Sequence, residues 1–232
     1  MSFDVSIISK GIWSIEQNDA RCFLIDGINY ALLVDCLYEG DLLNLCMNLV
    51  NKDVRLVLTH ADKDHIGCIS QFDQVFIHPS ELYNSSLSNG CPLNIKPVWE
   101  SDIFSLGTYS FEVILIPGHT SGSIALLERQ NRFIIGGDSV QRGPIYMFGS
   151  NRNLCAYKFS ILKLISLSTH FDFIYASHND LIVPKYVLND LLSLVDKVLN
   201  SELSGVEISH LKFPENTDLY SIGSARLLLS SV

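Results

Sequence analysis

Four apolar segments of this 232-residue chain each end in a histidine or an aspartate at the start of a loop. Both residue types bind metal ions, because imidazole nitrogen suits borderline metals such as zinc and carboxylate supplies a hard anionic oxygen. Loops at strand ends place reactive groups on a rigid scaffold, so ends that meet at one rim can form one site. The four residues are His60, His119, Asp138 and His178.

The densest group of potential ligands is the segment His60-Ala61-Asp62-Lys63-Asp64-His65. Alternation at positions 60, 62 and 64 would place three side chains on one side of an extended turn, and His65 can then point towards a second metal ion. The alternative is a solvated, charged loop with incidental histidines. Because histidines also stand at two other strand ends, chance is a poor explanation, and we expect a metal site.

Short apolar segments separated by turn signals predict the elements that carry these residues. In the first half, strands are predicted at 3–9, 11–15, 22–26, 30–35, 54–59 and 75–77, and helices at 41–51 and 79–88. A connector is predicted at 89–101. In the second half, strands are predicted at 111–116, 124–127, 133–135, 173–176, 206–213 and 226–229, and helices at 154–167 and 184–199. This order predicts two sheets packed face to face with helices outside them.

The composition is that of a globular protein, with 47% hydrophobic and 18% charged residues. The length favours one domain spanning residues 1–232. The net charge of −9 makes nucleic acid and anionic membrane surfaces poor partners, since both attract Lys and Arg. No apolar run reaches the roughly 18 residues of a membrane span, and Asp4 stands where a signal peptide has basic residues. We therefore expect a cytoplasmic protein with a small-molecule substrate.

The segment T-H-A-D-K-D-H at 59–65 resembles the T-H-x-H-x-D-H signature of the metallo-β-lactamase superfamily. The other motifs follow in the order of that family, over most of the chain from about residue 5 onwards. They are Asp35 in L-V-D, His119 in P-G-H-T, Asp138 in G-G-D-S and His178 in S-H-N-D. The set of motifs is specific for the fold and much less so for the substrate.

This resemblance implies a four-layer αββα sandwich with a site for two divalent metal ions, zinc first among them. By position, His60, His119 and residue 62 would hold the first ion, and Asp138 would bridge both ions. The second ion would be held by Asp64, His65 and His178. A water or hydroxide between two metals is a nucleophile at neutral pH, because the metals lower the pKa of the water towards about 7, and Asp64 would orient it and take its proton.

Asp62 departs from the family pattern, which most often has histidine at this position. An aspartate oxygen and a histidine Nδ1 both lie two bonds from Cβ, so Asp62 could reach the same metal. Three carboxylates and a hydroxide carry four negative charges, which two divalent ions balance, and the added carboxylate favours iron or manganese over zinc. The alternative is that Asp62 binds nothing and only one ion is held tightly.

The function expected from these motifs is metal-dependent hydrolysis of a small ester, thioester or lactone. In this family a bridging aspartate such as Asp138 is typical of thioesterases such as glyoxalase II, of lactonases and of nucleases, and the acidic net charge argues against a nuclease. One alternative is a di-iron redox or oxygen-handling protein without its own flavodoxin-type domain. Another is a non-catalytic regulatory or ligand-binding member with a weakened metal site.

The segment 139–171 contains no Asp or Glu, although it carries four basic residues. Its first part follows Asp138 directly, so we expect it to overhang the site. Arg142 and Tyr146 are the candidate substrate-binding residues, with Arg142 binding an anionic group of the substrate through bidentate contacts. The other basic residues are Arg152, Lys158 and Lys163, of which the two lysines are expected to be ordinary solvated surface.

Overall fold

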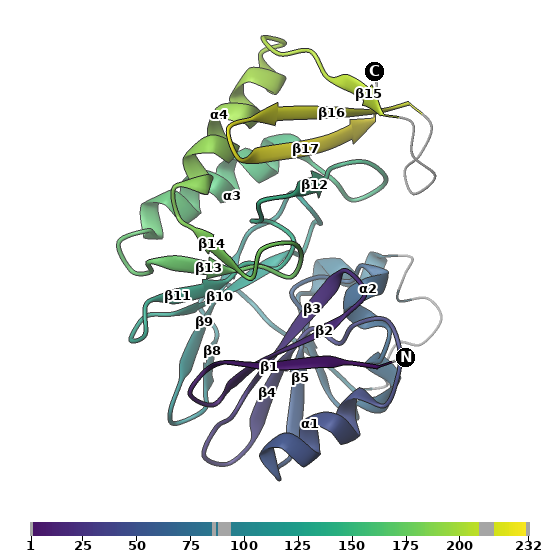
Figure 1. Ribbon diagram of the computed structural model, residues 1–232, viewed down its shortest axis with the longest axis vertical. Helices are drawn as coiled ribbons and strands as arrows, with labels where there is room; N and C mark the ends of the chain where they lie inside the picture. Colours follow the sequence, from purple (N-terminus) through teal and green to yellow (C-terminus); the bar gives the residue numbers. More distant parts are fainter. Residues whose placement is uncertain (1, 85–86, 88–93, 209–215, 231–232) are drawn as a thin grey trace.

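Two sheets pack face to face in the computed structural model, which describes residues 2–84, 87, 94–208 and 216–230 (Figure 1). The first sheet has the strand order β1-β2-β3-β4-β5-β6-β7, antiparallel from β1 to β4 and parallel from β4 to β7. Its strands are β1 (Asp4–Ser9), β2 (Ile12–Gln17), β3 (Ala20–Ile25), β4 (Ala31–Val34), β5 (Val54–Val57), β6 (Val75–Ile77) and β7 (Ile95–Pro97).

The second sheet has the order β14-β13-β11-β10-β9-β8. Its strands are β8 (Ile103–Ser105), β9 (Ser110–Leu115), β10 (Ile124–Glu128), β11 (Phe133–Ile135), β13 (Phe173–Tyr175) and β14 (Ile182–Pro184). A third sheet, which the sequence did not predict, has the order β12-β17-β16-β15. It consists of β12 (Pro144–Tyr146), β15 (Val206–Ile208), β16 (Thr217–Ile222) and β17 (Ala225–Ser230).

Helices cover the outer faces of the two large sheets, which confirms the expected αββα layers (Figure 1). Helix α1 (Leu42–Val50) lies against the first sheet, and α3 (Leu154–Leu167) and α4 (Val187–Leu199) lie against the second. Short helices follow β5 and β6: α2 (Lys63–Ile66), η1 (Ile69–Gln71) and η2 (Pro79–Tyr83). Within the described part of the chain, no helix has both the length and the apolar character needed to cross a bilayer.

Strand β3 shows how the layers are held together, because all six of its residues are buried. Successive side chains of a strand point to opposite faces. Phe23 and Ile25 therefore pack between the two large sheets, whereas Cys22 and Leu24 pack under α1. A strand buried on both faces fixes the distance between the layers, and the loops at the strand ends are fixed with it.

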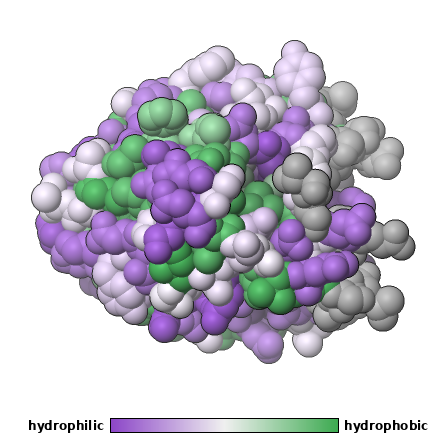
Figure 2. Space-filling view, turned by 90° about the horizontal axis from the view of Figure 1, so that it is seen from above, coloured by the Kyte–Doolittle hydropathy of each residue, from purple (hydrophilic) through white to green (hydrophobic). Residues whose placement is uncertain are grey.

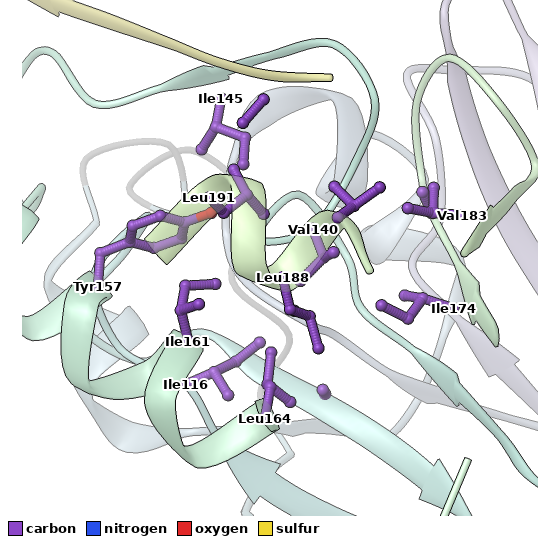
Figure 3. Close-up of a cluster of buried hydrophobic side chains, with 14 of the residues drawn as sticks. Ile116, Val140, Ile145, Tyr157, Ile161, Leu164, Ile174, Val183, Leu188 and Leu191 are labelled. Atoms are coloured by element: carbon purple, nitrogen blue, oxygen red, sulfur yellow. The ribbon is translucent and has the colours of Figure 1, made fainter. Parts of the chain in front are cut away.

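The largest core cluster lies between the second sheet, α3 and α4 (Figure 3). Tyr157 of α3 points into it with its ring, and its hydroxyl donates to the Ser139 carbonyl oxygen at 2.7 Å. Helix α3 thereby contacts the loop that carries Asp138. Ala225 and Leu227 of β17 close the same cluster from the third sheet. Seen from above the view of Figure 1, the molecular surface has hydrophobic patches that hydrophilic residues interrupt (Figure 2).

Several element boundaries differ from the sequence-based expectations. Helix α3 spans the predicted residues 154–167, but α4 starts at Val187 and not at 184, because Pro184 pairs with Phe173 at the end of β14. The predicted helix at 79–88 is only the short η2 in its first half, and residues 85–86 and 88 lie outside the described residues. Likewise β15 ends at Ile208, and 209–213 of the predicted strand are not described.

Candidate metal centre

Asp138 lies among four imidazole rings that come from three segments of the chain: His60 and His65 from the segment after β5, His119 from the loop after β9, and His178 from the loop after β13. Its carboxylate oxygens lie 3.2 Å from His65 Nε2, 3.3 Å from His178 Nε2, 3.7 Å from His119 Nε2 and 3.8 Å from His60 Nε2. Only 11% of the Asp138 side chain is exposed. The structure therefore brings together residues that end separate strands in the sequence. His60, His119 and His178, together with His65, surround the carboxylate of Asp138.

The potential ligands form two groups that share Asp138. The first ligand group is His60, His119 and Asp138, and the second ligand group is Asp64, His65, Asp138 and His178. In the second group, Asp64 Oδ2 lies 3.5 Å from His65 Nε2 and 3.1 Å from His178 Nε2. Zinc bonds of about 2.0–2.1 Å in tetrahedral geometry place ligand atoms about 3.3–3.4 Å apart. The separations in the second group are close to this spacing, and in the first group Asp138 lies slightly farther, at 3.7 and 3.8 Å, from the two histidine nitrogens, so either group could hold a metal ion.

Each of the four histidine rings is held through Nδ1, whereas its Nε2 faces the site. In every case Nδ1 faces an oxygen that accepts its hydrogen, which fixes the ring orientation and leaves the Nε2 lone pair directed into the site. The acceptors are Thr59 Oγ1 for His60, Asp35 Oδ2 for His65, the Tyr146 carbonyl for His119 and the Asp19 carbonyl for His178. Asp35 also accepts from the hydroxyl and the amide of Thr59, at 2.8 and 2.7 Å. The residue that orients His65 is therefore hydrogen-bonded to the residue that orients His60.

Several buried atoms of the site have no hydrogen-bond partner among the described residues. They are His60 Nε2, His65 Nε2, His119 Nε2 and Asp138 Oδ1. Buried polar atoms without partners are costly and call for an unseen partner such as an ion or water. Because these atoms all face the centre of the ligand groups and all belong to good metal donors, the residues present fit a metal site.

The charges of the site favour cations. Burial alone would raise the pKa of Asp138, but the neighbouring His178 and His65 outweigh burial and hold this pKa well below its ordinary value. Burial lowers the pKa of His178, yet the charge of Asp138 and hydrogen bonds to it and to Asp64 raise this pKa to about 10. The carboxylates thus favour the protonated form of His178 in the metal-free protein, and a metal ion that binds to this ring must displace its proton.

Asp62 lies beside the first ligand group and is bound to a basic residue. Its Oδ2 lies 3.3 Å from His119 Nε2 and 3.6 Å from His60 Nε2. Arg152 Nη2 donates to the same oxygen, and Asn84 Nδ2 donates to Oδ1 at 3.4 Å. The charge balance inferred from the sequence therefore needs correction, because it counted three carboxylates and omitted the guanidinium of Arg152.

The ligand groups open into a cleft of about 990 Å³. Asp64, Asp138 and His178 lie on its wall together with Tyr38 and Tyr146. The structure thus places Tyr146 where a substrate residue was expected.

Arg142 instead lines a neighbouring pocket of about 350 Å³, where its Nη1 donates to Asp180 Oδ2 at 3.1 Å. Lys158 and Lys163 pair with Asp196 and Glu100, respectively, on the half-exposed surface of α3.

Two residues of the site were missed as functional by the sequence analysis, namely Glu81 and Arg152. Glu81 is buried and accepts from the amides of Ala61 and Gly122, which lie in the His60 and His119 loops. The only signal for Arg152 was the run of basic residues at 139–171, and no pattern marked Glu81. Both residues act through contacts with segments distant in the sequence.

Comparisons with known proteins agree with the motifs. The sequence model of the metallo-beta-lactamase superfamily matches residues 17–183. The chain is 24% identical to the acyl-coenzyme A thioesterase MBLAC2 of Gallus gallus over 67% of its length and 66% of that protein. It is 28% identical to the hydroxyacylglutathione hydrolase of Aliivibrio fischeri (strain MJ11) over 53% of its length. The matches span less than two thirds of both relatives, and only 44% of the second.

The fold is also that of solved metallo-beta-lactamases. The enzyme from Pontibacter korlensis superposes with a TM-score of 0.71 over 84% of this chain and 99% of that one, at 18% identity. Metallo-beta-lactamase IND-7 gives a TM-score of 0.70 over 84% of this chain and 98% of that one, at 16% identity. These likenesses concern the fold, whereas the sequence model covers well over half of the chain. The chain belongs to the metallo-beta-lactamase superfamily.

Proposed function

We propose that this chain is a metal-dependent hydrolase of a small ester, thioester or lactone, with thioesters the first choice. One observation carries the proposal: two groups of metal donors share the buried Asp138 and face a cleft large enough for a small molecule. The names of the relatives add to it, because an acyl-coenzyme A thioesterase and a hydroxyacylglutathione hydrolase both cleave thioesters. The comparisons leave the substrate of this chain open.

The proposed cofactor is a pair of divalent metal ions, with zinc expected first. His60 and His119, with Asp62 beside them, would hold one ion. The second ligand group would hold the other through Asp64, His65 and His178, while Asp138 would serve both. Imidazole nitrogen suits zinc, and the guanidinium of Arg152 offsets the extra carboxylate of Asp62. This offset weakens the argument from charge for iron or manganese.

The chemistry of the cleft is divided between the metal ions and the residues of the chain. When bound, two divalent ions lower the pKa of coordinated water towards about 7 and polarise the carbonyl under attack. Asp64 is the proposed general base, because its carboxylate is 21% exposed on the cleft wall, next to His178. Asp35 and Thr59 hold the rings of His65 and His60, so the donor atoms need little reorganisation when ions bind.

Removal of the metal should abolish turnover. We expect dialysis against a chelator to reduce hydrolysis of acyl thioesters by about 1,000-fold or more, since the ions supply several kcal/mol of transition-state stabilisation. Readdition of zinc should restore the rate. The measurement is initial rate on a panel of thioesters and lactones, with elemental analysis of the protein purified without added metal.

Three results of this measurement would favour other readings. Turnover that survives complete loss of metal would refute metal-dependent hydrolysis. Iron with redox-dependent absorbance and no hydrolysis would favour the di-iron alternative. Full occupancy without turnover on the whole panel would favour a regulatory or ligand-binding member.

We also propose that Arg142 binds an anionic group of the substrate. Gln141 and Asn179 line the cleft, and their sequence neighbours Arg142 and Asp180 line the smaller pocket, so an extended substrate could reach both. Arg226 lies in the same pocket and adds a second positive charge. The charge and bidentate geometry of arginine suit a carboxylate or a phosphate.

Arg142→Ala should raise KM about tenfold for anionic thioesters, because a partly exposed charged hydrogen bond contributes about 1.4 kcal/mol. For neutral thioesters KM should stay unchanged, and kcat should stay similar for both classes. Lys158→Ala, which removes a charge from the surface of α3, is the control. An unchanged KM for every accepted anionic substrate would contradict this role of Arg142.

A further inference from the structure

Arg152 is directed towards the metal site although it lies 90 residues from Asp62 in the sequence. It stands in the loop before α3, and only 12% of its side chain is exposed. Its Nη2 donates to Asp62 Oδ2, while its Nε is buried without a hydrogen-bond partner among the described residues. A guanidinium is rarely buried in this way unless a carboxylate holds it.

The main chain fixes Arg152 relative to the first ligand group. The amide of Asn153 donates to the Gly118 carbonyl at 2.9 Å, and Gly118 directly precedes His119. A Cβ on Gly118 would come within 2.4 Å of Tyr157 Cα, and the φ of Gly118 is +144°, so only glycine allows this close approach. The start of α3 is therefore pressed against the His119 loop, and Arg152 is held next to the same loop.

Asp62 has the placement of a metal ligand. Its Oδ2 lies 3.3 and 3.6 Å from the Nε2 atoms of His119 and His60, and Asp138 Oδ2 lies 3.7 and 3.8 Å from the same two atoms. Both carboxylates thus lie within 3.8 Å of the two histidine nitrogens, which is close enough for all four groups to face one ion. A carboxylate oxygen has two lone pairs, so Asp62 Oδ2 can accept from Arg152 and bind a metal as well.

We propose that Asp62 and Arg152 act as one neutral unit in the place of an imidazole. Asp62 supplies an oxygen to the first metal ion, and Arg152 is a positioning residue that orients this oxygen and balances its charge. The pair carries a net charge of zero, as a neutral histidine would. The inference rests on the metal site of the proposed function, but it concerns metal binding and needs no turnover for its test.

The test counts metal ions in a set of variants. Each protein is saturated with zinc, freed of excess zinc by gel filtration and measured by elemental analysis. The wild type and Arg152→Gln should each hold two equivalents. Asp62→His should fall to about one, because the guanidinium then lies unpaired beside the first ion and repels it. The double variant Asp62→His/Arg152→Gln should recover two equivalents, because a neutral histidine needs no balancing charge.

Two controls separate charge from other effects. Asp62→His/Arg152→Lys keeps the positive charge and should stay near one equivalent. Lys158→Gln removes a charge from α3 away from the site and should keep two. Circular dichroism and the unfolding temperature of each variant check that it is folded. Retention of the ion in the second ligand group shows that the rest of the site is intact.

Distinct outcomes would overturn the inference. Two equivalents in Asp62→His with Arg152 present would mean that the residues are not coupled, as would no recovery in a folded double variant. One equivalent in the wild type and two in Arg152→Gln would mean that the guanidinium takes the place of the ion. If no variant and no wild-type protein bound zinc or another divalent ion, the proposed function would fail too, and this result is distinct from the others.

Discussion

Asp138→Asn should lower the metal content from two equivalents to one or fewer and reduce hydrolysis by at least about 1,000-fold. Asparagine keeps the shape of the side chain but removes its negative charge and replaces one oxygen with an amide nitrogen that cannot bind metal. Asp138 is the residue that both ligand groups share, and its oxygens lie within 3.8 Å of four histidine Nε2 atoms. The substitution therefore affects both ions, whereas loss of any one histidine would affect one.

The measurement combines elemental analysis with initial rates on the best thioester found. Asp172→Asn is the matched control, because it makes the same change at an exposed aspartate that pairs with Arg132. This control should keep both ions and the full rate. Two equivalents of metal in Asp138→Asn, with a rate close to that of the wild type, would show that Asp138 does not serve the two ions together.

Four of the potential metal donors could be predicted from the sequence, because each stands at the end of a predicted strand. His60, His119, Asp138 and His178 follow β5, β9, β11 and β13 in the structure within five residues. Short-range signals also sufficed for α3, where Asn153 caps the first turn by accepting from the Ala156 amide. Signals of this kind depend on neighbouring residues in the chain, which a sequence displays directly.

The features that could not be predicted depend on contacts between distant segments. Strand β12 has three residues and pairs in parallel with β17, from Pro144 with Arg226 to Tyr146 with Leu228. This apolar segment is too short to indicate a strand in the sequence, so the third sheet was not predicted. Arg152 reaches Asp62 across 90 residues, and only the packed start of α3 brings the two together. The charge beside His60 and His119 was therefore misjudged from the sequence.

Glu81 is a second residue whose role depends on such contacts. It lies in η2, is 1% exposed, and holds two loops of the site with one carboxylate. Its Oε2 accepts from the Ala61 amide at 2.8 Å, and its Oε1 accepts from the Gly122 amide at 2.7 Å. Ala61 lies between His60 and Asp62, and Gly122 closes the loop of His119. The loops that carry His60, Asp62 and His119 are thus tied to Glu81.

Glu81→Ala should lower the free energy of unfolding of the metal-free protein by about 2–6 kcal/mol, since two buried amides lose their acceptor at about 1–3 kcal/mol each. Glu81→Gln keeps one oxygen and should cost about half as much. Urea denaturation in the presence of a chelator gives these values from the shift in midpoint at constant m. Glu100→Gln, which breaks an exposed pair with Lys163, should change stability by less than about 1 kcal/mol.

Glu81→Gln should also weaken the binding of the two metal ions, and to different extents. We expect Glu81→Gln to lower the affinity of the first ion by about 10- to 100-fold, the usual effect of removing a residue that holds metal ligands. The second ion should change little, because Asp35 holds His65 and the Asp19 carbonyl holds His178, both independently of Glu81. Stepwise competition with a chromophoric zinc chelator resolves the two affinities. An equal loss at both ions would mean that Glu81 supports the fold as a whole, and no loss at either would mean that the His60 and His119 loops hold their positions without it.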